Sequence, residues 1–133
     1  EQMPAIVITS NREQELPTAF KGRCIYHYIN FPNAETMRKI LDKHFPKVET
    51  KIVDVALDVF YHLRKIGLER APTTRELLNW LKYVKRFTTE EAIEKINKLE
   101  GIGALIKTQT DLEKLQQKMP DARDFSRRGP NLN

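Results

Sequence analysis

Residues 72–84, PTTRELLNWLKYV, combine a helix-capping pair with apolar side chains at helical spacing. Thr73 and Glu76 stand three residues apart, so each side chain can accept a hydrogen bond from the other's backbone N–H group. Apolar side chains then recur at helical spacing, at Leu77, Leu78, Leu81 and Val84. This pattern predicts an amphipathic helix over residues 74–86.

More helices are predicted on both sides of this stretch. Thr88 and Glu91 repeat the capping pattern, and Asn33 is a favourable N-cap for a helix that follows Pro32. Together with the apolar spacing, these signals predict helices over residues 34–45, 51–66, 74–86, 89–98 and 110–118. We therefore expect a helical subdomain over residues 33–118, with a flexible tail of low core content over 119–133.

The first 32 residues have a different character. Residues 5–9, AIVIT, are apolar and β-branched, and residues 25–31, IYHYINF, are rich in aromatic and β-branched side chains. We expect two short parallel strands joined by a crossover helix over residues 13–21, which Gly22 ends. Two strands shield neither their faces nor their edges, so the rest of such a sheet must come from elsewhere. We expect the chain to belong to a longer protein.

The composition narrows the environment and the partners. The chain has 133 residues, of which 31% are charged, and a net charge of +5, which is compatible with an acidic partner or simply with a solvated surface. It contains no apolar run near the ~20 residues that span a membrane. The lone Cys24 fits a reducing cytoplasm, and the scattered histidines predict no metal site.

Asn11 is the first candidate for chemistry, because it follows an apolar segment directly. In parallel α/β sheets ligands bind beyond the carboxyl ends of strands, where a polar side chain can orient a water or touch a phosphate. The alternative is that Asn11 only caps the next helix, with Gln14 as its capping partner.

Arg23 is the second candidate, since it lies between a predicted helix end and a predicted strand. From there its planar guanidinium could reach a phosphate bound by a neighbouring subunit. A surface arginine that complements a helix C-terminus explains the same position.

Arg75 is the third candidate, in the first turn of the helix predicted over residues 74–86. The helix dipole disfavours a cation there, while the free backbone N–H groups favour an anion. A bound phosphate would compensate the arginine charge, and so would the carboxylates of Glu76 or Glu69.

Trp80, Tyr83 and Phe87 lie at helical spacing and are interpreted as core or interface side chains. The sequence contains no glycine-rich phosphate loop and no Ser/His/Asp pattern. We therefore do not expect the chain alone to be an active enzyme.

Three stretches together resemble MoxR-like AAA+ ATPases. Residues 6–32, from IVITSNRE to YHYINFP, resemble the later half of the nucleotide-binding core of that family. Residues 71–80, APTTRELLNW, resemble the start of the lid helix that carries its second sensor, and residues 103–108 resemble the close of the lid. The family's Walker A and Walker B segments are missing from the chain, and Gly22 stands where a basic or polar residue often precedes the arginine finger.

The resemblance implies a role for each candidate. Asn11 would be the sensor-1 residue that positions the attacking water, Arg23 the arginine finger acting on ATP of the adjacent subunit, and Arg75 the sensor-2 arginine. It implies ATP with Mg²⁺ as cofactor, a homo-oligomeric ring, and a client or von Willebrand-type partner protein. The competing interpretation is a helix-turn-helix nucleic-acid binder built on residues 51–66 and 74–86, with basic residues facing phosphates at Arg75, Lys82, Lys85 and Arg86. It explains the positive charge but neither Asn11 nor Arg23, so nucleic acid is not the expected partner.

Overall fold

The chain divides into two compact units, Glu1–Phe31 and Pro32–Asn133. The structure, a computed structural model, describes residues 4–10 and 15–118. Asn11 and the tail over residues 119–133 lie outside the described residues.

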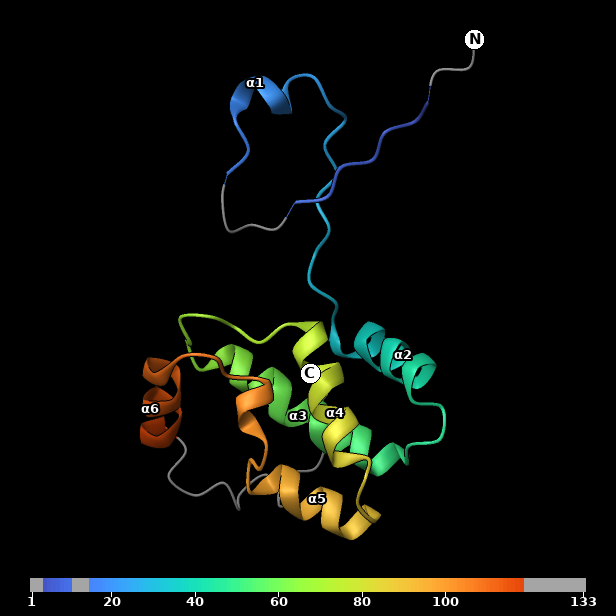
Figure 1. The fold of residues 1–133 in the computed structure, drawn as a ribbon, viewed down its shortest axis with the longest axis vertical. Helices are drawn as coiled ribbons and strands as arrows, with labels where there is room; N and C mark the ends of the chain where they lie inside the picture. The colour runs from blue at the N-terminus through green and yellow to red at the C-terminus, as the bar shows by residue number, and fades with distance from the viewer. Residues whose placement is uncertain (1–3, 11–14, 119–133) are drawn as a thin grey trace. The chain divides into compact units, whose positions relative to one another are not determined.

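The second unit is helical, as the sequence predicts (Figure 1). Its elements are α2 (Ala34–His44), α3 (Thr50–Lys65), α4 (Thr74–Val84), α5 (Thr89–Asn97), the short 3₁₀ helix η1 (Ile102–Ala104) and α6 (Gln109–Lys118). Helix α3 packs against α2 and α5, and α4 packs against α2, α5 and η1. The predicted helices therefore share one core.

That core is formed by the apolar faces that the sequence pattern indicates. Trp80 and Phe60 are its largest fully buried side chains, and both have no exposed surface. The same core cluster contains buried leucines from α2, α3 and α4, at Leu41, Leu63, Leu77 and Leu81. Burying each large apolar side chain stabilises the fold by about 1.5–3 kcal/mol.

Local capping contacts set where three of the helices begin. The Asn33 side chain accepts a hydrogen bond from Thr36 N at 2.8 Å, which starts α2. Both predicted capping boxes are present, Thr73 with Glu76 at α4 and Thr88 with Glu91 at α5. These interactions span only three residues, which is why the sequence shows them.

The turn after α5 is held against α4. Trp80 Nε1 donates a hydrogen bond of 2.9 Å to the Glu100 carbonyl. The next residue, Gly101, has a φ of 71°, and a Cβ there would come within 3.0 Å of the Tyr83 ring. Tyr83 in turn meets Phe87 edge to face at 5.4 Å between ring centroids. The aromatic stripe is therefore used inside the fold, as interpreted from its spacing.

The start of the helical unit is anchored by a tyrosine. Tyr61, in α3, donates a hydrogen bond of 2.7 Å from its hydroxyl to the Pro32 carbonyl. Burial raises the pKa of Tyr61 above its ordinary value, and the nearby Arg64 partly opposes that rise. The contact fixes the chain one residue before the N-cap of α2.

The two strands predicted in the first unit are not formed. Residues 4–10 and 24–33 have no regular secondary structure, and no strand occurs anywhere in the part of the chain that the structure describes. The predicted helix over residues 13–21 is reduced to one turn, α1 (Thr18–Lys21), since residues 15–17 are not helical and 11–14 are outside the description. A strand needs a neighbour for its backbone N–H and C=O groups, and these two segments do not supply one another with it.

Most apolar side chains of the first unit are consequently in solvent. Val7 is 87% exposed and Ile29 is 79% exposed. The fold is thus mainly α, as predicted, without the predicted strands. None of the helices among the described residues has the length and apolar character needed to cross a membrane.

Candidate functional site

Arg75 is the second residue of α4 and its side chain is exposed. The first N–H groups of a helix have no acceptor within that helix, so this end carries a partial positive charge. No hydrogen bond or ion pair joins the Arg75 guanidinium to any other residue in the described ranges. The site therefore presents a cation beside backbone donors, a combination that suits an anion.

Glu76, one of the two carboxylates that could have compensated Arg75, is occupied elsewhere. It is buried, with 7% of its surface exposed. Its Oε2 accepts from Thr73 N at 2.8 Å and from Thr73 Oγ1 at 3.1 Å, while Oε1 lies 2.8 Å from Arg70 Nη1. The carboxylate thus closes the capping box on one side and pairs with Arg70 on the other.

Glu69, the second such carboxylate, also faces another cation. Its Oε1 lies 3.5 Å from Lys114 Nζ, in α6. The structure therefore removes the intramolecular explanation for Arg75 that the sequence left open, because neither Glu69 nor Glu76 pairs with it.

The segment that leads into α4, residues 66–73, is held by side-chain hydrogen bonds near both of its ends. Arg64, in the last turn of α3, donates from Nη1 to the Pro72 carbonyl, and its guanidinium lies 5.9 Å from the Phe60 ring centroid. Burial lowers the pKa of Arg64 from its ordinary value. At the other end, Lys118 Nζ donates to the Ile66 carbonyl at 2.6 Å.

Asp111 accepts hydrogen bonds from the backbone in the middle of the same segment. Its carboxylate accepts from Glu69 N at 2.7 Å and from Arg70 N at 3.2 Å, and only 1% of the residue is exposed. Burial by itself raises the pKa of Asp111, but the hydrogen bonds from the two backbone N–H groups and from Thr108 outweigh it, so the net pKa is lowered. The carboxylate is therefore held in its charged form.

Neither Asp111 nor Arg70 is among the site residues predicted from the sequence. Thr108 and Asp111 stand three residues apart, and Asp111 N donates to Thr108 Oγ1 at 3.1 Å. That spacing is a recognisable N-terminal helix signal. Nothing local indicates that the Asp111 carboxylate turns inward to a segment some forty positions earlier in the chain.

Arg23 belongs to the other unit and lies just after α1. Its side chain is exposed, and Nη1 donates to the Ala19 carbonyl at 3.2 Å. This is the helix-end contact that the sequence offered as the alternative to an arginine finger. A single exposed hydrogen bond leaves the guanidinium with further donors, so the finger role stays a prediction.

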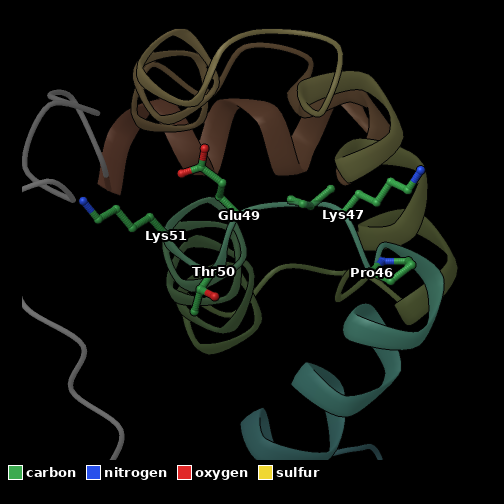
Figure 2. A pocket seen from close by; sticks show the side chains of 6 residues that line it. Pro46, Lys47, Glu49, Thr50 and Lys51 are labelled. Atoms are coloured by element: carbon green, nitrogen blue, oxygen red, sulfur yellow. The ribbon is translucent and has the colours of Figure 1, made fainter.

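A shallow hollow of about 470 Å³ lies in the connection between α2 and α3 (Figure 2). It is lined by consecutive residues, from Pro46 to Lys51. Figure 2 shows the side chains of Lys47 and Lys51 extending away from each other. Neither Arg23 nor Arg75 lines the hollow, and its polar groups do not converge on a common point.

None of the family models, curated proteins or solved structures compared with the chain matches it.

Proposed function

We propose that the chain is the C-terminal part of a MoxR-like AAA+ ATPase, in which the helical unit is a lid that responds to bound ATP. The observation that carries this proposal is the state of Arg75, an exposed arginine in the first turn of α4 without an acidic partner among the described residues. An ATP phosphate would complete the site, because it accepts charge-assisted hydrogen bonds from a guanidinium and from helix N-terminal amides.

Two features of the fold support the proposal. Residues 32–118 form a helical unit with its own hydrophobic core, as expected for a lid that moves as one body. The first unit exposes apolar side chains on segments without regular secondary structure, including Ile6, Val7, Ile8 and Ile25. Segments of this kind are suited to enter a sheet whose other strands lie in another part of the protein.

The roles of the remaining parts follow from the resemblance. Asn11 orients the attacking water, and Arg23 stabilises transition-state charge on ATP bound by the adjacent subunit. ATP and Mg²⁺ are held mainly by the phosphate loop and Walker B segment of the full-length protein. The assembled ring, in the cytoplasm, remodels a client or a von Willebrand-type partner.

The geometry does not favour the helix-turn-helix alternative. A helix-turn-helix joins its two helices by a tight turn of about three or four residues. Here α3 and α4 are connected by the longer segment 66–73, which is fastened to α3, α4 and α6. Lys85, one of the proposed phosphate contacts, lies over the Phe45 ring at 5.3 Å.

The decisive experiment compares Arg75→Ala with Arg86→Ala in the full-length protein. Arg86 is an exposed arginine just after α4 and serves as the matched control. We expect Arg75→Ala to weaken Mg-ATP binding by about 1.5–3 kcal/mol, the contribution of a hydrogen bond to a charged group, and Arg86→Ala to leave it unchanged. Duplex DNA binding of each variant is measured at two salt concentrations alongside.

Two results would contradict the proposal. One is unchanged ATP affinity and turnover in Arg75→Ala. The other is loss of DNA binding in Arg75→Ala with a shallower salt dependence, which is the signature of a phosphate contact to nucleic acid.

A further inference from the structure

Helix α6 reaches the segment before α4 through a buried carboxylate. Asp111, in the first turn of α6, accepts hydrogen bonds from Glu69 N at 2.7 Å and Arg70 N at 3.2 Å. Lys118 Nζ adds a second contact, to the Ile66 carbonyl at 2.6 Å. The end of the helical unit is thus attached to backbone that lies just upstream of Arg75.

The attachment continues into the first turn of α4. Asp111 holds the backbone of Arg70, whose side chain pairs with Glu76 at 2.8 Å. Glu76 in turn caps Thr73 N at 2.8 Å. Two buried acids, Asp111 and Glu76, therefore stand at the two ends of a chain of polar contacts that runs from α6 to the turn carrying Arg75.

We propose that Asp111 is a positioning residue for Arg75, and that docking of α6 is thereby coupled to contact between Arg75 and an ATP phosphate. The inference rests on the proposed function of Arg75. It also extends that function, because coupling between two events is reciprocal. If the docked α6 strengthens ATP binding, bound ATP strengthens the docking of α6 by the same factor.

If Asp111 only stabilised the fold, its loss would weaken ATP binding equally with and without Arg75. A double-mutant comparison distinguishes the two roles. Mg-ATP affinity is measured in the full-length protein for wild type, Asp111→Asn, Arg75→Ala and the double variant. Glu113→Gln, an exposed acid on the same helix, is the control for loss of a carboxylate from α6.

We expect Arg75→Ala to weaken ATP binding about tenfold or more, Asp111→Asn about fivefold, and Glu113→Gln not at all. The double variant should bind no more weakly than Arg75→Ala, because the effect of Asp111 passes through Arg75. An equal loss on adding Asp111→Asn in both backgrounds, or no loss in either, overturns the inference.

Arg70→Gln provides a second variant should Asp111→Asn fail to fold. The Arg70 side chain is 48% exposed, so this change removes the link to Glu76 without opening the core. Arg86→Gln is its control. We expect Arg70→Gln also to weaken ATP binding only when Arg75 is present, and a loss that is independent of Arg75 overturns the proposal.

Hydrogen exchange provides a readout of the reverse direction of coupling. Mg-ATP should slow exchange of the Glu69 and Arg70 amides, which donate to Asp111, in wild type but not in Arg75→Ala. Equal slowing in both proteins overturns the inference. If Arg75→Ala itself leaves ATP affinity unchanged, the proposed function fails and this inference fails with it. If Arg75→Ala weakens binding and Asp111→Asn does not, only the inference fails.

Discussion

Arg70 Nη1 lies 2.8 Å from Glu76 Oε1, and this ion pair takes up the carboxylate adjacent to Arg75. The pair is asymmetric, since the Arg70 side chain is half exposed while Glu76 is buried and also caps the backbone of Thr73. Glu76 therefore contributes most of the pair's stabilisation, because losing its carboxylate leaves the half-buried backbone N–H of Thr73 without its acceptor.

The two capping boxes should consequently differ in what they contribute to stability. Glu76→Gln keeps the side-chain shape but removes the charge that pairs with Arg70, and we expect a loss of about 1–2 kcal/mol. Glu91→Gln changes the equivalent residue of α5, which is exposed, and should cost no more than about 0.5 kcal/mol. Urea unfolding of the 133-residue chain measures both, and equal losses would contradict the role assigned to the Arg70–Glu76 pair.

Asp111 should make stability depend on acid pH. Its folded-state pKa is lowered, so its contribution is present above the ordinary aspartate pKa and is lost as pH falls through that value to the folded one. We expect the free energy of unfolding to fall less steeply below about pH 5 in Asp111→Asn than in wild type. Gln117→Ala, an exposed neutral change on α6, is the control. Identical pH profiles for Asp111→Asn and wild type would count against the buried hydrogen bonds.

Gly101 should resist substitution for two independent reasons. Its φ of 71° is unfavourable for any L side chain, and a Cβ would come within 3.0 Å of Tyr83. We expect Gly101→Ala to destabilise the chain by about 1–2 kcal/mol. Gly103→Ala is the matched control, because nothing lies within 4 Å of a Cβ there. Thermal unfolding of both variants checks the difference, and a tolerant Gly101 would argue against the packing of this turn on α4.

The 133-residue chain should not hydrolyse ATP by itself. The reaction needs a phosphate loop and magnesium ligands, and neither motif occurs in the sequence. Phosphate release in the presence of Mg-ATP is the measurement, with the full-length protein as positive control. Turnover by the purified chain above background would refute the proposal that catalysis needs a phosphate loop and Walker B segment that this chain does not contain.

If the chain belongs to the proposed ring-forming ATPase, Arg23→Ala in the full-length ring should abolish hydrolysis and leave ATP binding nearly intact. A finger that acts on the neighbour's nucleotide contributes about 10³–10⁵ in rate, while affinity is set by the subunit that owns the phosphate loop. Mixing Arg23→Ala subunits with subunits whose phosphate loop is disabled should restore part of the activity. Lys21→Ala, an exposed cation of the same helix end, is the control. If no mixing ratio restores turnover, action between subunits is ruled out.

The helices and most of their starts can be predicted from local sequence, because they depend on contacts three or four residues apart. Asn33, Thr73 and Thr88 cap the predicted helices, and the apolar stripes form the predicted core. The strands predicted over residues 5–9 and 25–31 are not formed. An apolar, β-branched segment becomes a strand only when other backbone is aligned beside it. The sequence of the segment itself does not show whether such a partner is present.

Which charges pair depends on the packing of elements that are far apart in the sequence. From the sequence, Glu69 and Glu76 were both available to Arg75, yet they pair with Lys114 and Arg70. The sequence could not indicate the role of Asp111, because the backbone N–H groups that it accepts from lie more than forty positions away in the chain and meet it only after α6 has packed. Packing brings distant backbone donors and acceptors together and removes water from between them. Among the residues that the structure describes, that step leaves the exposed Arg75 without an acidic partner.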